Sequence, residues 1–527
     1  MEILSMKNAV KMLAMVLAAA LMLTALPATQ AGAEPERPVE VNRTYETIAP
    51  SPAAAVVSYD LSLKLDTQND RLTESVKAEL QNNTDAAVET LYLRFYPMGY
   101  YGYLMEVYPK TTDVNKEKKA GITGIRFDGS NQELPTEYLM DGTCIMIPLG
   151  DQAMAPGEKR TLVIEAWTDI PDAENRFGII RHEQGKTYLL SFCFPYVECS
   201  SEGMWQVDPP IYLAGEGENR NPDLKDYHVE IEVPEGFTVA SAGTVTAGDG
   251  TVSIDLKEAR DFAMAVSDFM DVDTFEVRGI TIRNYYLTAG AMDAYREISK
   301  QSITDAVEFY TDWLGEYPRK ELVMVQGVAG MEHSGFFFLE GQSFLRNESA
   351  EKYNGLQRNI AHETGHAWFY DTVGNSEFRE GWIDEGICSF ISSDVLLYNN
   401  LESYKTVGKY DPTWTAERYS KSRDSVMSME ERILKQDHDH LYLNEIWTVY
   451  PDGLEQGLKE YTYAPIFLRR AKEIMGMDAV RGFLHDVREA GDMKIIHTAE
   501  ILKILRSYND SPEMNELLMY YFDEKAE

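Results

Sequence analysis

The sequence is poor in cysteine and in basic residues, and each shortage excludes a class of protein. Four cysteines in 527 residues are too few for a disulfide framework, and their spacing matches no zinc–thiolate site. Only 49 Lys and Arg stand against 86 Asp and Glu, which gives a formal net charge of −37. Because a surface this acidic repels phosphate backbones and anionic lipids, nucleic-acid binding is not expected.

Beyond its first 33 residues the chain lacks any apolar stretch long enough to cross a bilayer. At its start, Lys7 and Lys11 precede an apolar run from Met12 to Leu26, and the small residues Ala31-Gly32-Ala33 follow. This order is typical of a cleaved secretory signal peptide, with an uncleaved membrane anchor as the alternative. We therefore expect a signal peptide at 1–33 and a secreted, extracytoplasmic protein without stable membrane insertion after cleavage.

The few cysteines divide into two kinds. Cys193 and Cys199 are close enough in sequence to pair in an oxidising compartment. Cys144 lies in a strand-like run and Cys388 in an apolar helical one, where buried thiols are expected.

What the chain does have is a long region of alternating apolar and polar residues. From Tyr59, apolar residues recur at every second position through Leu65, which is the pattern of a half-buried strand. Similar runs follow at Thr90–Tyr96, Thr161–Trp167, Asp226–Val233, Thr251–Leu256 and Gly279–Leu287. We expect an antiparallel β domain at 59–287, sandwich-like or saddle-shaped, after an extended Pro- and Ala-rich arm at 34–58.

After residue 288 the apolar period changes to that of helices. A helix is expected from Met292 to Leu314, ended by Gly315, and a strand at Glu321–Val325. Further helices are expected at Asp384–Leu397, Asp411–Lys435, Tyr463–Met475, Asp478–Glu489, Thr498–Ser507 and Pro512–Phe522. The chain is thus predicted to be a multidomain α+β protein whose part 288–527 is mainly helical.

One helix, expected at Asn359–Tyr370, contains the pattern H-E-x-x-H. Residues four apart lie on one helix face, so His362 and His366 can bind one metal ion. Glu363 lies between them, where its carboxylate can polarise a metal-bound water.

A catalytic zinc site needs a third protein ligand and an open position for water. A third His six residues after His366 is excluded, because Thr372 occupies that position. The candidate is Glu385, nineteen positions after His366, since that interval allows a turn at Gly374 and a second helix alongside the first.

These residues resemble the zinc signature of the M1 family of zinc aminopeptidases, which belongs to the gluzincins. Gly330-Met331-Glu332 also matches the family's G-x-M-E-N exopeptidase motif in part, with His333 in place of the final Asn. Gly315-Glu316-Tyr317-Pro318 and Leu93-Arg94-Phe95-Tyr96-Pro97 are similar to the family as well, and the resemblance extends from about Tyr59 to the last residue.

The resemblance implies a thermolysin-like catalytic domain at 288–527 with one Zn²⁺ per chain and peptides as substrates. It implies that Glu363 acts as general base and that Gly330, Met331 and Glu332 bind the substrate, Glu332 pairing with its free α-ammonium group. The family's oxyanion-stabilising Tyr is expected at Tyr461, with Tyr463 as the rival.

The sequence also departs from the family in ways that keep other functions open. Only about 66 residues follow Tyr461, so the large C-terminal helical domain of longer members is expected to be absent and the site more open. His333 leaves a zinc endopeptidase or another hydrolase of the same fold as an alternative. The family's Tyr stands in a Y-x-K-G pattern, whereas Tyr463 and Ala464 replace the Lys and Gly here. These changes leave a non-catalytic peptide-binding protein as a third possibility, and the oligomeric state stays open.

Overall fold

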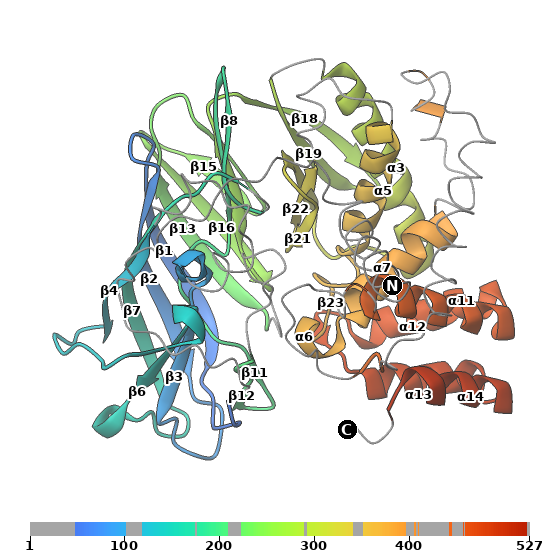
Figure 1. The fold of residues 1–527 in the computed structure, drawn as a ribbon, viewed down its shortest axis with the longest axis horizontal. Helices are drawn as coiled ribbons and strands as arrows, with labels where there is room; N and C mark the ends of the chain where they lie inside the picture. Colours follow the sequence, from blue (N-terminus) through green and yellow to red (C-terminus); the bar gives the residue numbers. More distant parts are fainter. Residues whose placement is uncertain are drawn as a thin grey trace, which may run out of the picture. The chain divides into compact units, whose positions relative to one another are not determined.

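The computed structural model describes residues 48–101, 119–173, 176–208, 223–288, 292–340, 351–396, 405–406, 409, 442–444, 457 and 459–523. The expected signal segment, the arm up to residue 47 and the helix expected at Asp411–Lys435 lie outside these residues. The described chain forms two compact units, divided between Met270 and Asp271. Each is described by itself below (Figure 1).

A seven-stranded sheet dominates the N-terminal unit. In order across the sheet, its strands are β15 (Thr244–Ala247), β16 (Thr251–Ala259), β13 (Lys225–Glu232), β1 (Ala55–Asp66), β2 (Arg71–Gln81), β7 (Lys159–Asp169) and β4 (Ala120–Phe127). Neighbouring strands are antiparallel apart from β1 and β13, which run parallel. The alternation from Tyr59 to Leu65 does place these apolar side chains in the core. Strand β1 begins at Ala55, so the end of the expected arm is strand.

Smaller sheets complete this unit. One contains β10 (Tyr196–Val197), β3 (Thr90–Arg94), β6 (Cys144–Pro148) and β5 (Glu137–Leu139), and another β14 (Thr238–Ser241), β17 (Ala263–Ser267), β9 (Gly185–Ser191) and β8 (Phe177–His182). A two-stranded sheet contains β11 (Ser200–Ser201) and β12 (Met204–Trp205), and short 3-10 turns lie at η1 (Tyr96–Tyr101), η3 (Met140–Gly142) and η4 (Gly150–Gln152). No disulfide joins Cys193 to Cys199, whereas Cys144 and Cys388 are buried thiols as expected.

The C-terminal unit is built on a mixed five-stranded sheet. Its order is β18 (Met270–Val277), β19 (Ile280–Leu287), β20 (Glu321–Gly327), β22 (Phe336–Glu340) and β21 (Met331–His333). Strands β19, β20 and β22 run parallel, and β21 is an antiparallel edge strand. The expected boundary at 287/288 is therefore too late, because β18 and β19 pair into this sheet although their alternation resembles that of the preceding strands.

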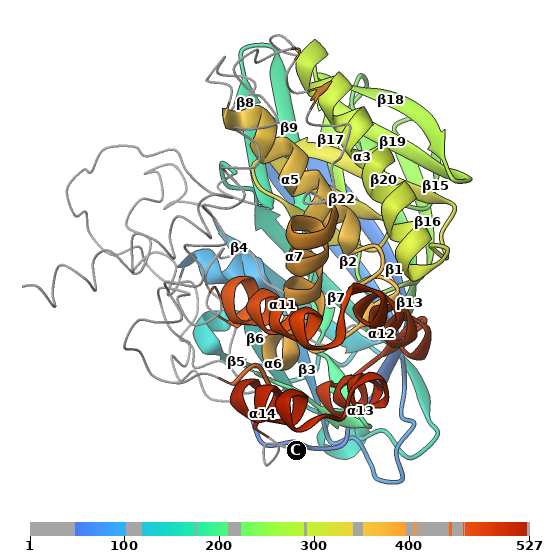
Figure 2. The ribbon, with the colours of Figure 1, turned by 90° about the vertical axis from the view of Figure 1, so that its right-hand side faces the viewer.

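Two long helices, α3 (Asp293–Leu314) and α5 (Glu351–Gly365), cover one face of this sheet (Figures 1 and 2). Helix α3 ends where predicted, at Gly315, whose φ of 89° favours glycine. Helix α5 ends at Gly365 and does not continue to Tyr370. There the hydroxyl of Tyr310 on α3 donates to the Ala361 carbonyl (2.9 Å) and would lie 2.7 Å from a Cβ at Gly365. A contact between two helices, which sequence periodicity does not report, therefore lies at this end of α5.

The second helix, expected at Asp384–Leu397, is helical from Trp382 to Leu396 but irregular. It consists of the π-helical turns η5 (Trp382–Gly386) and η6 (Ile391–Leu396) on either side of α7 (Ile387–Phe390). The remaining elements are α6 (Glu377–Glu380), β23 (Val373–Gly374), η7 (Lys459–Tyr463), α11 (Ala464–Met475), α12 (Met477–Ala490), β24 (Lys494–Ile495), α13 (Thr498–Tyr508) and α14 (Pro512–Tyr521). The four C-terminal helices match their predicted ranges to within a few residues and group together in Figure 2.

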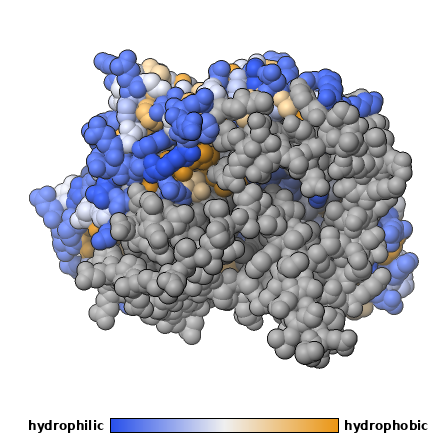
Figure 3. Space-filling view, turned by 45° about the horizontal axis from the view of Figure 1, so that its top comes forward, coloured by the Kyte–Doolittle hydropathy of each residue, from blue (hydrophilic) through white to orange (hydrophobic). Residues whose placement is uncertain are grey.

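The described part of the surface is largely polar. The coloured part of the face in Figure 3 is mostly hydrophilic, with scattered hydrophobic residues. Among the described helices, none combines the length and the apolar content that a bilayer span requires.

Candidate active site

The three predicted metal ligands converge in the C-terminal unit. His362 lies on α5, His366 directly follows that helix, and Glu385 lies in η5. The Nε2 atoms of the two imidazoles are 3.1 Å apart. Oε2 of Glu385 lies 2.9 Å from Nε2 of His362 and 3.5 Å from Nε2 of His366. Three donor atoms from two elements therefore face a common point.

Backbone contacts orient this set. Nδ1 of His366 donates to the Phe369 carbonyl (3.1 Å), and because a carbonyl only accepts, the proton lies on Nδ1 and the lone pair on Nε2 faces the cluster. Burial would raise the pKa of Glu385, but the neighbouring imidazoles, His366 first, hold that pKa well below its usual value. Glu385 is thus a charged oxygen donor.

The donor set fits zinc. Two imidazole nitrogens and one carboxylate oxygen form the ligand set that Zn²⁺ takes at hydrolytic sites, where a further position stays open to water or substrate. The set is also only partly enclosed, since the side chains of His362 and Glu385 keep 13% and 17% of their surface exposed while His366 keeps 1%. His362, His366 and Glu385 are the residues that would hold the ion.

The predicted base, Glu363, is buried beside this set. Its side chain is on α5, 4% of the residue is exposed, and one carboxylate oxygen lies within 4.8 Å of ligand atoms of both His366 and Glu332. Its Oε1 accepts a hydrogen bond from Nδ2 of Asn359 at 2.9 Å.

The predicted substrate-binding residues lie at the edge of the sheet. Glu332 is in the edge strand β21 and is 5% exposed. Met331 is 2% exposed and belongs to the core. Gly330 packs against the base, because a Cβ there would lie 2.1 Å from Oε1 of Glu363.

The two candidate tyrosines are separated by their surroundings. The hydroxyl of Tyr461, in η7, donates to Oε1 of Glu385 at 2.5 Å. Burial, reinforced by Glu385, raises the pKa of Tyr461 well above its usual value, so the hydroxyl keeps its proton. Tyr463 is 2% exposed and packs edge-on against Tyr521, with ring centroids 6.4 Å apart. Only Tyr461 is brought to the metal ligands.

Sequence reasoning missed three polar residues beside this site. Asn359 contacts the base, and Glu377 and Asp384 each offer a carboxylate oxygen within 4.8 Å of that of Glu332. Asp384 is fully buried, and burial, followed by the charge of Glu385, raises its pKa well above the usual value. No spacing rule identifies these residues, although Asp384 directly precedes a predicted ligand and Asn359 lies one helical turn before the base.

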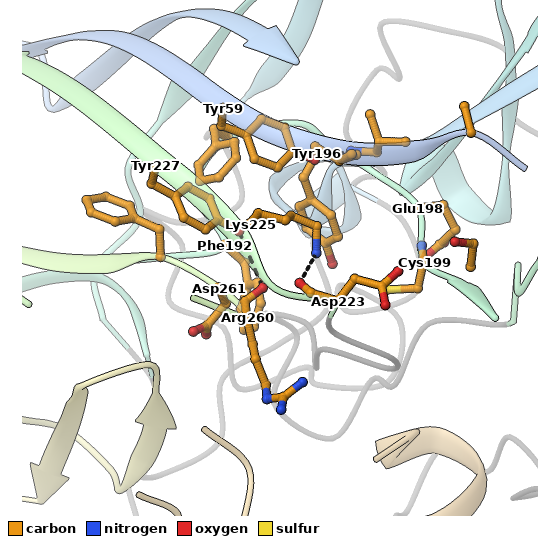
Figure 4. Close-up of a pocket in the computed structure, with 16 residues that line it drawn as sticks. Tyr59, Phe192, Tyr196, Glu198, Cys199, Asp223, Lys225, Tyr227, Arg260 and Asp261 are labelled. Atoms are coloured by element: carbon orange, nitrogen blue, oxygen red, sulfur yellow. Dashed lines mark hydrogen bonds between the residues drawn. The ribbon is translucent and has the colours of Figure 1, made fainter. Parts of the chain in front are cut away.

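A separate cavity lies in the N-terminal unit (Figure 4). Its walls include Tyr59 stacked on Tyr227 (centroids 5.4 Å apart), and the amine of Lys225 donates to the Asp223 carbonyl at 2.7 Å. Among the described residues, the groups of side chains spaced to hold a metal lie elsewhere. The cavity contains none of the predicted site residues.

The fold and the site define the class of the protein. A β-rich domain, followed by a mainly helical domain in which an H-E-x-x-H helix and a downstream Glu converge, is the arrangement of a zinc metallopeptidase. Residues 299–451 match the model of the Peptidase family M1 domain. Over these residues the chain is therefore similar to the M1 peptidase domain.

The Tricorn protease-interacting factors F2 of two archaea are similar in sequence to part of the chain. The factor of Thermoplasma acidophilum is 25% identical over 230 residues, which are 42% of this chain and 26% of that protein. The factor of Thermoplasma volcanium is 26% identical over 195 residues, 35% of this chain and 22% of that protein. The matched part thus spans about a quarter of the length of these curated relatives.

Solved structures share the fold over most of the chain. The M1 zinc metallopeptidase of Deinococcus radiodurans has a TM-score of 0.59 at 13% identity and covers 90% of this chain and 94% of its own. A mutant of it bound to a Tyr-Ser-Ala substrate has a TM-score of 0.56 at 13% identity, with 89% and 94% covered. At this identity the likeness concerns the fold.

Proposed function

We propose that the protein is a zinc-dependent peptidase that releases N-terminal residues from peptides. The observation that carries the proposal is the convergence of His362, His366 and Glu385 beside the buried carboxylate of Glu363. A mutant M1 zinc metallopeptidase of similar fold has been solved with a bound Tyr-Ser-Ala substrate, which supports peptides as the substrate class.

In this proposal Glu363 moves the proton of the reaction. His362, His366 and Glu385 would hold a zinc ion, which would act as a Lewis acid and lower the pKa of water toward neutrality. Glu363 accepts the proton of the attacking water and then delivers it to the nitrogen of the departing amine. Its burial next to His366 supports this role, because it holds the carboxylate close to the metal ligands.

Tyr461 is proposed to stabilise the negative charge that develops on the substrate carbonyl oxygen. Its hydroxyl remains protonated and lies at the metal ligands, so it can donate to an oxyanion formed there.

Glu332 is proposed to select the amino end of the substrate. Its carboxylate is buried within 4.8 Å of Glu363 and His366. A free α-ammonium group would pair with it, whereas a blocked amino end would leave the buried carboxylate without that charge. The edge strand β21 supports binding of an extended peptide as an added strand.

Hydrolysis of aminoacyl reporter substrates tests the proposal. We expect activity in the zinc-loaded protein, loss on chelation, recovery with added Zn²⁺, and a fall of about 10²–10⁴-fold in kcat for Glu363→Gln. Turnover that persists in this variant or after chelation would overturn the mechanism. Zinc should also raise the unfolding temperature of the wild type and of Glu363→Gln, but not that of His362→Ala.

An endopeptidase of the same fold is the second candidate. It is favoured by His333, which occupies the last position of the exopeptidase motif and is 4% exposed. Equal cleavage of a free and an N-acetylated peptide would select it over the aminopeptidase.

Export is proposed on the basis of residues 1–33, whose basic start, apolar run and small residues are typical of a signal peptide. Fractionation of cells that express the full chain, with a version lacking residues 1–33 as control, tests it. Retention of the full chain in the cytoplasm would overturn it.

A further inference from the structure

The side chain of Asn359 connects three parts of the catalytic unit. Its Nδ2 donates to Oε1 of Glu363 at 2.9 Å, one helical turn further along α5. Its Oδ1 accepts from the backbone N–H of Glu340, the last residue of β22, at 3.3 Å. Because a backbone N–H only donates, this contact fixes which end of the amide faces the carboxylate.

The backbone of Gly330 packs on the same pair of groups. A Cβ at Gly330 would lie 2.1 Å from Oε1 of Glu363 and 2.4 Å from Nδ2 of Asn359. The segment that leads into the edge strand β21 therefore contacts both the amide of Asn359 and the carboxylate of Glu363. Asn359 is 6% exposed and Glu363 4%, so water competes little for this hydrogen bond.

We propose that Asn359 is a positioning residue that sets the orientation of the general base, an inference that rests on the proposed peptidase function. A glutamate has three side-chain torsions, and a base that rotates freely spends part of its time turned away from the water it must deprotonate. The amide holds Oε1, so the carboxylate has one orientation and its other oxygen, Oε2, keeps a fixed direction. Asn359 itself touches neither substrate nor metal ligand.

The same contacts place the base relative to the residue that recognises the substrate. Glu340 ends β22, and β22 pairs with β21, where Glu332 lies opposite Phe337. The amide thereby ties helix α5, which carries the base and a metal ligand, to the strand pair that carries Glu332. Loss of the amide should harm the chemical step more than the binding of peptides.

Two variants of Asn359 and one control test the proposal. Asn359→Ala removes the amide. Asn359→Asp keeps the shape and the acceptor for the Glu340 N–H but places an oxygen where Nδ2 donated. Thr364→Val is the control, because the buried Thr364 hydroxyl lies on the same helix and donates only to the Ile360 carbonyl, at 2.6 Å.

We expect kcat of both Asn359 variants to fall about 100-fold while KM stays within about twofold and the zinc content is unchanged. Thr364→Val should keep the kcat of the wild type even if its unfolding temperature falls. An unchanged kcat in both Asn359 variants, or an equal loss in Thr364→Val, would contradict the positioning role.

Crystal structures of the metal-free variants give a readout that does not depend on activity. The carboxylate of Glu363 should leave its wild-type position in Asn359→Ala, or occupy more than one, and should turn away from residue 359 in Asn359→Asp. An unmoved carboxylate in both would overturn the inference. An inactive wild type with this displacement would count against the proposed function alone, since the geometric claim would stand.

Discussion

Tyr461 and Glu385 share a hydrogen bond of 2.5 Å, in which the tyrosine hydroxyl donates to Oε1 while Oε2 of the same carboxylate faces the two histidines. The tyrosine thus contacts a metal ligand on the side away from the imidazoles. Because burial keeps the hydroxyl protonated, it remains a donor throughout the neutral pH range. The contact supports the proposed role of Tyr461 as a donor to an oxyanion formed at this site.

We expect Tyr461→Phe to lower kcat about 100-fold with little change in KM, because the lost donor acts on charge that develops only in the transition state. Tyr463→Phe is the matched control, since that ring lies two residues on and packs against Tyr521. Steady-state kinetics with an aminoacyl reporter measure both. Equal losses in the two variants would assign Tyr461 to packing.

Glu332→Gln should abolish the preference for a free amino end. In the wild type a peptide with a free amino end should be cleaved far faster than its N-acetylated form. The variant should lose about 100-fold or more in kcat/KM on the free peptide, because the substrate ammonium then has no buried counter-charge, and should change little on the acetylated one.

Glu321→Gln controls for the loss of a negative charge, because Glu321 lies in the same sheet but pairs with Arg283. Competition assays with the two peptides directly give the ratio of kcat/KM for the free peptide to kcat/KM for the N-acetylated peptide. A ratio that is the same in Glu332→Gln and the wild type would remove Glu332 from recognition of the amino end.

The sequence predicted those features that depend on local patterns. The alternation from Tyr59 to Leu65, the helix end at Gly315 and the convergence of His362 with His366 all follow from strand or helix geometry and turn chemistry. Local patterns also predicted the C-terminal helices to within a few residues. These features need no knowledge of which elements meet in space.

The errors concern contacts between elements distant in sequence. Strands β18 and β19 alternate like the strands before them, and only the pairing of β19 with β20, and of β18 with β19, assigns them to the catalytic unit. Helix α5 ends at Gly365, where Tyr310 on α3 packs against it. The role of Asn359 depends on Glu340 and Gly330, neither of which is its neighbour in the chain. Pairing and packing partners, unlike periodicity, are not recorded in a single sequence.

Gly330→Ala should inactivate the protein without unfolding it. The added Cβ would lie 2.1 Å from Oε1 of Glu363, so the base must move, and a displacement of about 1 Å costs on the order of 100-fold in rate. Activity and the unfolding temperature should be measured together.

Gly355→Ala is the control for the Gly330 variant, because it lies in α5 with no atom within 4 Å of an added Cβ. It should keep full activity and gain about 0.5–1 kcal/mol of stability from the better helix former. Normal turnover in Gly330→Ala would show that the base has room to move.

The last prediction concerns a buried acid in the N-terminal unit. Glu74 is 1% exposed on the core face of β2, between the buried Leu72 and Val76. In the described chain neither carboxyl oxygen makes a hydrogen bond of ordinary geometry. Burial raises the pKa of Glu74 well above its usual value, and the Thr168 hydroxyl offsets this only in part. The titratable neighbour is Cys193, whose thiol pKa burial also raises.

The sign of the pH dependence follows from this raised pKa. Below the pKa of the unfolded chain, Glu74 is protonated in both states and has no effect on their balance. Above the unfolded-state pKa, Glu74 ionises in the unfolded chain but keeps its proton in the folded one. The free energy of unfolding therefore falls by up to about 1.4 kcal/mol per pH unit until the folded-state pKa is reached.

Glu74→Leu should therefore stabilise the protein increasingly, relative to the wild type, as the pH rises from 5 to 8. Denaturant unfolding at each pH measures this, with Glu79→Gln, whose side chain on the same strand is 41% exposed, as a control that changes little. A stability difference between Glu74→Leu and the wild type that does not vary with pH would mean that Glu74 is already ionised in the folded state.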